Sequence, residues 1–590
     1  MKHVSLKRTL SALLAGLLLL FEGACIRIPL PQQAEAPREI SAADTAAWNQ
    51  ADLDFFREYI TSDISTLHQL IKDPAAFGID YAAVERTLGT YAQAEEADWY
   101  AFVEDMLSRL SEIDRNGLSD RDQLAYDTLL QYLRFEQEGE NYYGYFEPLL
   151  PYTGIQADLP IVFWFYELRC EQDVEDYLTL MADTPRFFSE LLSYEEYRAK
   201  ELNIFMVEAN LNKVLEDIDS TIAAGEDIFL VDTFQEALQG VPGLTQAQRT
   251  AYEQRHEALL KNQFHQAYVD LRAGLEALRP YCREAVGVAS LGNDTYTDWF
   301  VFQLKQSCAE DEDPEFLADI LYEGAMKNMR LAVRAIQAGG QDLKQVTMGT
   351  VEENVSYLRE LLDPLLPELP EVNVRYEQVP EAFREVMSPA FYLVPAFDDW
   401  QNNTIALNGP EEARNLLSTL AHEGFDGHLY QYVYHRSQGF SLSEQLLEET
   451  AYAEAWSQYS ERLLAEHIDK KYRKMDLQLD HYFQQAITCL IGYCSIRVNL
   501  YKDSFEDAYD IFHSFFTYTE EEFRELIYEP YIIGSPFYYM PYAYGYARLM
   551  DLHDGWKAAR GRSFSEKDFH SAYLSLGPSY FNLLADRLEK

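Results

Sequence analysis

The stretch AHEGFDGHLYQ, residues 421–431, decides how the rest of the chain is interpreted, because it places two histidines and a glutamate within seven residues. In the zincin pattern H-E-x-x-H, two histidines four residues apart share one helix face, and the glutamate lies beside the metal-bound water. Here Asp426 stands four residues after His422, and the second histidine, His428, follows two residues later. The stretch therefore has the residue types of a metal site at an unusual spacing.

Two glycines offer a physical reason for this spacing. On an unbroken α-helix six residues turn ~600°, so His422 and His428 would point ~120° apart. Gly424 and Gly427 can adopt backbone conformations that other residues rarely adopt, so a distorted turn could bring both imidazoles to one ion. We interpret the stretch as a zinc site. The alternative is an amphipathic helix with two incidental histidines.

A third protein ligand is needed, since two histidines and a water molecule do not complete tetrahedral zinc. The helical segment EETAYAEAWSQYSERL, residues 448–463, offers candidates. Spacing alone does not choose among its glutamates, which are Glu448, Glu449, Glu454 and Glu461. His435 is a rival for the second histidine, because it follows His428 by seven residues and lies on nearly the same helix face. We prefer His428, which stands in the motif.

The chain is strongly acidic, with 48 lysines and arginines against 98 aspartates and glutamates and a formal net charge of −50. Such a field repels phosphate backbones and anionic membrane surfaces, so we exclude nucleic acid as a partner. Hydrophobic residues make up 47% of the chain and aromatic residues 14%, which excludes global disorder. Five cysteines besides Cys25, with no CxxC pair, give no thiolate zinc site.

The first residues have the order of a bacterial lipoprotein signal. Basic residues precede an apolar run at residues 10–21, and Gly-Ala-Cys follows at residues 23–25. The apolar run is too short to span a bilayer comfortably. We expect cleavage before Cys25, a lipid on that cysteine, and an extracytoplasmic location on the bacterial cell membrane. Because Glu22 stands where such signals carry an apolar residue, an ordinary cleaved signal and secretion are the alternative.

The length and the hydrophobic pattern predict the architecture. At 590 residues the chain exceeds what one hydrophobic core usually holds, so two lobes or more are expected. Between residues 45 and 278 apolar residues recur every three to four positions, which predicts an all-helical lobe. The pattern changes near Pro364, where prolines punctuate three β-like runs, at residues 372–376, 390–394 and 404–408.

We therefore predict a mainly α, two-lobed helical fold with a small β element beside the metal-binding helix. The expected divisions are a signal peptide at residues 1–24, a tether at 25–44, an N-terminal helical lobe at 45–363 and a catalytic region at 364–590.

The motif at residues 422–431 resembles that of a bacterial zincin-like metallopeptidase family, long catalogued as a domain of unknown function and common in secreted proteins and lipoproteins. The segment 451–463 resembles the family's glutamate-glycine-tryptophan helix, with Ala455 in place of the glycine. The segment PFYYMPYAYGYARL, residues 536–549, resembles a family segment with a tyrosine three residues before a glycine. The resemblance extends patchily from about Ala46 to the C-terminus.

This resemblance implies a zincin-like fold and a zinc metallopeptidase that hydrolyses peptide bonds, in particular those of short peptides. His422, His428 and Glu454 would hold the zinc. Glu423 would take a proton from the zinc-bound water as the water attacks the peptide carbonyl.

The same resemblance implies two further roles. Tyr542 would donate a hydrogen bond to the developing oxyanion, with Tyr546 one turn further on as the runner-up. The strand at residues 404–408 would line the cleft and offer a free edge to an extended substrate. The sequence does not predict cleavage preference, endo or exo mode, or oligomeric state.

Two departures from the family pattern keep a second hypothesis open. Asp426 replaces the usual proline, either to orient His428 through its other ring nitrogen or as an exposed residue where proline is dispensable. The segment SIRVNLY, residues 495–501, lacks a histidine that the family carries. The alternative is therefore a catalytically impaired lipoprotein that binds peptides or another ligand on the same scaffold.

Overall fold

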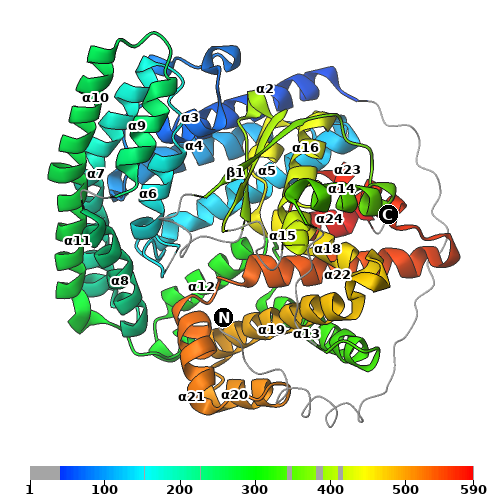
Figure 1. Cartoon of the computed structure of the whole chain (residues 1–590). Coiled ribbons are helices and arrows are strands. Elements are labelled where there is room, and N and C mark those ends of the chain that lie inside the picture. The colour runs from blue at the N-terminus through cyan, green and yellow to red at the C-terminus, as the bar shows by residue number, and fades with distance from the viewer. Residues whose placement is uncertain are drawn as a thin grey trace.

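The computed structural model describes residues 40–588, except residue 152 and the segments 226–227, 342–348, 380–389 and 410–415, and describes only the backbone of residues 94–96 (Figure 1). The predicted signal peptide at residues 1–24 and the lipid-carrying Cys25 lie outside the described residues. In the described part of the chain, no helix combines the length and the apolar character needed to cross a membrane.

Helices dominate the described residues, which confirms the predicted mainly α fold. The first half contains α2 (Ala42–Ile60), α3 (Ile64–Leu70), α4 (Gln93–Ser111), α5 (Asp120–Gly139), α6 (Ile155–Phe165), α7 (Glu171–Tyr197), α8 (Glu208–Ala224), α9 (Leu230–Gly240), α10 (Gln246–Leu259), α11 (His265–Leu278), α12 (Asp294–Ser307), α13 (Pro314–Gln337) and α14 (Val351–Leu362). The second half contains α15 (Leu416–Glu423), α16 (His428–Gln438), α17 (Leu442–Leu446), α18 (Thr450–His467), α19 (Lys474–Tyr501), α20 (Phe505–His513), α21 (Glu520–Phe523), α22 (Met540–Arg560), α23 (Glu566–Leu576) and α24 (Phe581–Leu588). In Figure 1, α7 to α11 stand together at one side of the molecule.

Local sequence explains where helices begin. At the start of α14, the Thr350 hydroxyl accepts the Glu353 N–H at 3.3 Å, and the Glu353 carboxylate accepts the Thr350 N–H at 3.0 Å. α2 begins directly after Ser41, whose hydroxyl accepts the Asp44 N–H at 3.2 Å. The last residues of the predicted tether at 25–44 are therefore helical, because this cap starts the helix at Ala42.

Two large clusters of buried apolar side chains form the cores. One lies among α6 to α11 and takes its residues from Phe56 to Leu278, with Phe397. The other takes its residues from Leu124 to Ala585 and surrounds the metal-site motif. Because α13 packs along α19, the predicted boundary between residues 363 and 364 lies inside this second core and does not separate the two.

The second core also joins the ends of the chain. α5 contacts α24, and the hydroxyls of Thr128 and Ser579 are hydrogen-bonded at 2.6 Å. Asn582 donates from its side-chain amide to Gln131 at 3.0 Å. Residues near the C-terminus therefore complete a core that begins before residue 130.

The three β-like runs form one small sheet, as predicted. It contains β1 (Asn373–Gln378), β2 (Ala390–Leu393) and β3 (Asn402–Leu407), in the order β1-β3-β2. β1 runs parallel to β3, and β2 runs antiparallel to it.

The position of β3 corrects one expectation. This strand precedes the metal-site helix and was expected to offer a free edge, but β1 and β2 pair with its two sides. Residues 403–407 are all buried, which fits a central strand covered on both faces. Among the described strands, the outer edges belong to β1 and β2, and β2 is the strand that contacts α15.

Candidate metal centre

The glycine-containing turn between α15 and α16 brings the two histidines of the motif together. α15 ends at Glu423, and α16 begins at His428. A Cβ atom at Gly427 would lie 1.7 Å from the backbone oxygen of His422, so only glycine fits there. The turn replaces the unbroken helix that would hold the imidazoles apart, and their ring centroids lie 4.9 Å from each other.

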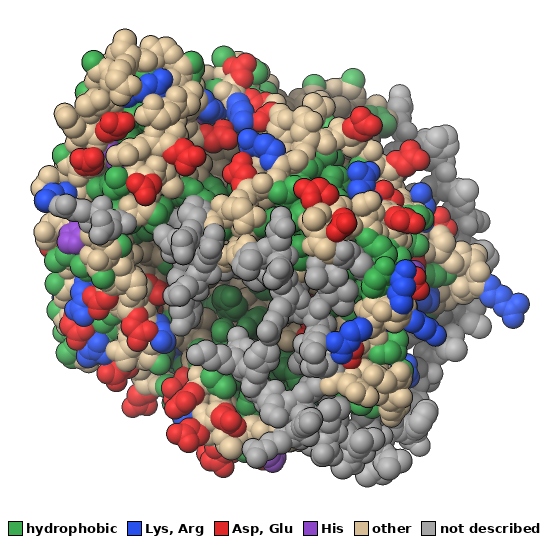
Figure 2. Space-filling model, viewed as in Figure 1, with side chains coloured by type: hydrophobic (Ala, Val, Ile, Leu, Met, Phe, Trp, Pro, Cys, Tyr) green, Lys and Arg blue, Asp and Glu red, His purple; other side chains and the backbone are tan. Residues whose placement is uncertain are grey.

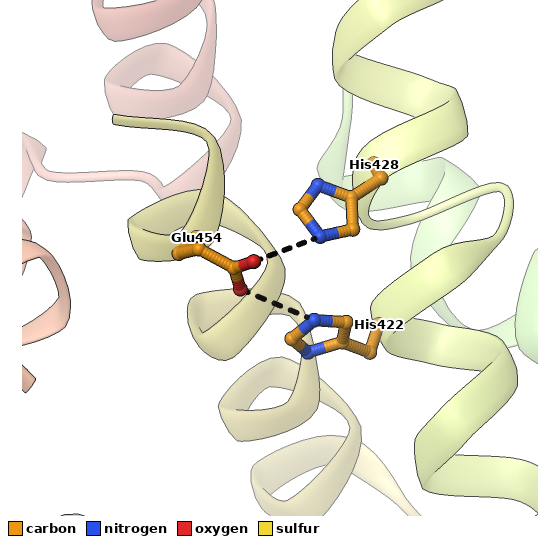
Figure 3. A group of neighbouring side chains, drawn as sticks. All are labelled: His422, His428 and Glu454. Carbon is orange, nitrogen blue, oxygen red and sulfur yellow. Dashed lines mark ion pairs between the residues drawn. The ribbon is translucent and has the colours of Figure 1, made fainter. Parts of the chain in front are cut away.

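A carboxylate from α18 completes the cluster. Glu454 Oε2 lies 3.4 Å from His422 Nε2, and Glu454 Oε1 lies 3.7 Å from His428 Nε2. Figure 3 shows the three side chains pointing toward one another from three helices. Their ligand atoms all lie within 4.8 Å of one another, and no other group of histidine, cysteine or acidic side chains among the described residues does so.

The chemistry of the cluster fits a metal ion. Two imidazole nitrogens and one carboxylate oxygen are a usual ligand set of catalytic zinc sites. Glu454 Oε2 is buried and has no hydrogen-bond partner among the described residues, so a cation between the three groups would satisfy it. Burial acts to raise the pKa of Glu454, but the neighbouring rings of His422 and His428 and a hydrogen bond from Tyr542 outweigh it and lower that pKa.

Glu461, a rival ligand by spacing, lies behind His422 instead. Its Oε1 is 2.8 Å from His422 Nδ1, so Nδ1–H donates to it and Nε2 remains for a metal. Burial acts to raise the pKa of Glu461, but the contacts with His422 and His481 outweigh it and lower that pKa to about 2. Glu461 is therefore an anionic acceptor that orients His422.

The predicted base and the predicted oxyanion donor lie beside this cluster. Glu423 Oε2 accepts the backbone N–H of Tyr392, in β2, at 2.8 Å. The Tyr542 hydroxyl, from α22, interacts with Glu454, and burial followed by the charge of Glu454 raises the pKa of Tyr542. Tyr546, the runner-up, is buried, and its hydroxyl lies 3.1 Å from His481 Nε2.

His435, the rival second histidine, and Asp426 both lie outside the three-residue cluster. His435 is buried, with its Nε2 3.3 Å from the Tyr452 hydroxyl, and it is not part of the three-residue cluster. Asp426 is fully buried, and neither carboxylate oxygen has a hydrogen-bond partner among the described residues. Both interpretations of Asp426 are therefore wrong: it does not orient His428, and it is not exposed. Its backbone oxygen accepts the Trp456 indole N–H at 2.9 Å, which holds the turn.

Three groups at the site were not assigned these roles from the sequence: the Tyr392 amide, Glu461 and His481. A signal existed for Glu461, which follows Glu454 by seven residues and so lies on the same face of α18. His481 comes from α19, the helix that also carries the segment 495–501. No spacing relates it, or Tyr392, to the motif.

The chain matches a family model described as "Bacterial protein of unknown function (DUF885)" over residues 74–320 and 315–588. A crystal structure of "the putative lipoprotein from Colwellia psychrerythraea" has a TM-score of 0.78 at 14% identity, and the match covers 92% of this chain and 98% of that chain. A structure of "a putative lipoprotein of unknown function from Shewanella oneidensis" has a TM-score of 0.55 at 15% identity. That match covers 93% of this chain and 100% of that chain.

These two likenesses show the fold. A crystal structure of a "putative peptidase from Chlamydophila abortus" has a TM-score of 0.35 at 14% identity, covers 93% of each chain and supports no argument about function. No curated protein matches the chain.

Proposed function

The chain belongs to the bacterial family DUF885, and from the geometry of its metal centre we propose that it is a zinc-dependent metallopeptidase acting on short peptides. The observation that carries the proposal is the convergence of His422, His428 and Glu454, with Glu423 next to them in the chain. Zinc bound by these three side chains would lower the pKa of a coordinated water and polarise a substrate carbonyl.

Glu423 is the group that would move protons. The Tyr392 amide holds its Oε2, so the carboxylate is oriented and its other oxygen is left for the transferred proton. As the water oxygen bonds to the peptide carbon, Glu423 takes the water proton. When the C–N bond breaks, Glu423 passes that proton to the leaving amine, which returns the carboxylate to its starting state.

Tyr542 would stabilise the negative charge that develops on the carbonyl oxygen. Because burial and Glu454 raise the pKa of Tyr542, the phenol keeps its proton and remains a hydrogen-bond donor at neutral pH. A donor aimed at the developing charge is worth several kcal/mol, about 2.7–4 for one oxyanion-hole donor in a model protease.

The surroundings of β2 support an extended peptide as the substrate. Its outer edge can pair with a peptide backbone, and that edge lies beside Glu423. Phe165 of α6 contacts Phe391 of β2, with ring centroids 5.8 Å apart, so the N-terminal helices reach this strand. Figure 2 shows the visible face hollowed near its centre, with hydrophobic side chains in the hollow. The side chains of His422, His428 and Glu454 are only 14%, 18% and 12% exposed, and a recessed site favours short peptides over folded proteins.

We also propose that the protein is anchored outside the cytoplasm by a lipid on Cys25. The order of basic, apolar and small residues before that cysteine supports this location. The protein from Colwellia psychrerythraea with the same fold is described as a "putative lipoprotein". Cys25→Ala should move the protein from the membrane fraction to the soluble fraction. Equal membrane retention of the variant would contradict the anchor.

Glu423→Gln tests the peptidase. The variant should keep stoichiometric zinc, measured by elemental analysis, and lose hydrolysis of a peptide mixture followed by mass spectrometry. His428→Ala is the control, because it should lose zinc as well as hydrolysis. Full activity of Glu423→Gln would show that the base is wrong. A wild-type protein that binds peptides without cleaving them would favour the binding protein instead.

A further inference from the structure

A polar cavity lies behind His422, on the side of the ring that faces Glu461. Its volume is about 280 Å³, and seven of the eight residues that line it are polar. α15 contributes Ser418, α18 contributes Glu461, and α19 contributes Asp480, His481 and Gln485. The cavity therefore shares one residue, Glu461, with the surroundings of the first metal centre.

Buried polar atoms without partners line this cavity. His481 is 6% exposed, and its Nδ1 has no hydrogen-bond partner among the described residues. Its Nε2 is 3.1 Å from the Tyr546 hydroxyl, and the Glu461 oxygen closest to Nδ1 is 3.8 Å away, too far for a hydrogen bond. Gln485 is 4% exposed, and its Oε1 also lacks a partner there. Native structures rarely leave such atoms unsatisfied.

Two carboxylates, those of Glu461 and Asp480, line the cavity, and no lysine or arginine does. Burial, followed by the negative charge of Glu461, raises the pKa of Asp480 to about 6. At one other buried site the fold does supply a cation, since Glu195 has the guanidinium of Arg198 at 2.8 Å. The cavity lacks the cation that the fold supplies at that other site.

We propose that this cavity binds a second divalent cation, held by Glu461 Oε2 and His481 Nδ1, with water molecules that hydrogen-bond to Asp480 completing its coordination. The two named atoms are 3.8 Å apart, which metal–ligand bonds of about 2.0–2.2 Å span at an angle of about 130°. The Tyr546 oxygen would accept the His481 Nε2–H and so fix the tautomer whose Nδ1 binds metal.

The ligand types select the class of ion. One imidazole among oxygen ligands suits Mn²⁺ or Zn²⁺, whereas Ca²⁺ takes an all-oxygen shell. Fewer direct protein ligands make this site weaker than the first. Glu461 would link the two sites, with Oε1 accepting the His422 Nδ1–H and Oε2 binding the second cation. The second ion would thereby weaken the hold of Glu461 on His422, a consequence that rests on the proposed function.

Metal stoichiometry tests the proposal. The full-length protein is dialysed to equilibrium against Mn²⁺ or Zn²⁺ and its bound metal is counted by elemental analysis. Wild type should bind two ions per chain. Asp480→Asn and His481→Gln should each bind one, and both should melt cooperatively by circular dichroism. His428→Ala, which changes the first centre only, should also bind one ion.

The outcomes separate the two sites. A single wild-type ion that His428→Ala loses and both cavity variants keep would overturn the second site, and so would two ions retained in both cavity variants. A single wild-type ion that His428→Ala keeps and both cavity variants lose would leave the second site standing while the first centre fails. The proposed peptidase and the second cation site therefore fail independently.

Discussion

Two carboxylates near the histidines differ in what they touch. Glu461 accepts a hydrogen bond from His422 Nδ1 at 2.8 Å, whereas the carboxylate of Asp426 has no hydrogen-bond partner among the described residues. Asp426 is fully buried and Glu461 is partly buried, but only Glu461 is placed to fix the orientation of a candidate ligand ring. Position in the motif is therefore a poor guide to which acidic residue supports the metal.

Glu461→Ala should lower zinc affinity roughly 10–100-fold, because the ring of His422 loses the acceptor that orients it. Asp426→Ala is the matched comparison, since it removes a carboxylate within the motif that holds no ligand; its affinity should change by less than about tenfold. Competition with a chelator of known zinc affinity measures both. Equal losses in the two variants would mean that Glu461 has no special part in holding His422.

Among the residues of the site, the sequence predicts that chain neighbours lie close together. It predicts few of the contacts between residues that are distant in the chain. His422 and Glu423 are adjacent, so their proximity is certain, and the family pattern points to Glu454 where spacing leaves four glutamates open. The contact between Glu423 and the Tyr392 amide depends on how β2 pairs with β3, which no local pattern encodes. The assignment of metal ligands itself stays a prediction until metal is measured.

At the scale of elements, α18 and α22 approach most closely where a glycine faces the partner helix. A Cβ atom at Gly545 would lie 2.3 Å from the backbone oxygen of Ala451. Gly545 is three residues after Tyr542 on α22, and Ala451 is three residues before Glu454 on α18. The close approach therefore sets the distance between the proposed oxyanion donor and the third metal ligand.

Gly545→Ala should force the two helices apart and destabilise the protein by roughly 1–3 kcal/mol, the usual cost of overpacking. Peptidase activity should fall more than zinc affinity, because Tyr542 moves with α22. Gly555→Ala is the control on the same helix, where an added Cβ meets open space, and it should stabilise by about 0.5–1 kcal/mol. Chemical denaturation and activity assays measure both variants. Equal changes in stability and in activity would contradict the close packing of α18 against α22 at Gly545.

For the sheet, the sequence predicts where the strands lie in the chain but not the order in which they pair. Composition and prolines place all three strands within a few residues, but the strand order depends on pairs such as Tyr376 with Ile405, which are more distant in the chain. One signal for the central strand was available. The run Thr404-Ile405-Ala406-Leu407 contains mostly apolar residues without alternation, a pattern typical of a strand covered on both faces.

At the scale of the whole molecule, an N-terminal helix holds the segment between the metal-site helices. Asp52 of α2 accepts the backbone N–H groups of Ser443 at 2.8 Å and Leu442 at 3.0 Å, at the start of α17. Glu444 lies beside them, almost fully buried, and its Oε2 accepts the Ser441 N–H at 3.1 Å. Residues almost 400 positions apart therefore share one buried acidic cluster.

This cluster predicts a pH dependence of stability. Burial raises the pKa of Glu444 from 4.5 to about 8, so the folded protein binds a proton there that the unfolded chain releases. The contribution of this proton to stability is complete below the unfolded pKa and is lost as pH rises toward about 8. Glu444→Gln, which cannot ionise, should therefore gain stability relative to wild type at about pH 9 compared with about pH 5.

Thermal melts of both proteins at the two pH values test this difference. Glu216→Gln is a suitable control, because the Glu216 side chain is 64% exposed and should give no comparable change. A constant difference between Glu444→Gln and wild type at both pH values would show that Glu444 is ionised in the folded protein.

The sequence predicts the helical class of the whole molecule but not how its halves are joined. Periodicity gives each helix its apolar face, and the change near Pro364 marks the β element. The predicted boundary there does not separate the cores, because α13 lies along α19 and apolar faces carry no label for their partners. Only the pairing of distant helices decides which residues share a core.

The contact between α5 and α24 has a consequence for when the protein can fold. The core around the metal centre includes residues as late as Ala585, so this core is unfinished until nearly the whole chain is available. A chain that crosses the membrane unfolded would therefore gain its activity only on the far side. Under the proposed function, the proteins and peptides of the cytoplasm would never meet the folded peptidase, and no separate inhibitor would be needed to protect them.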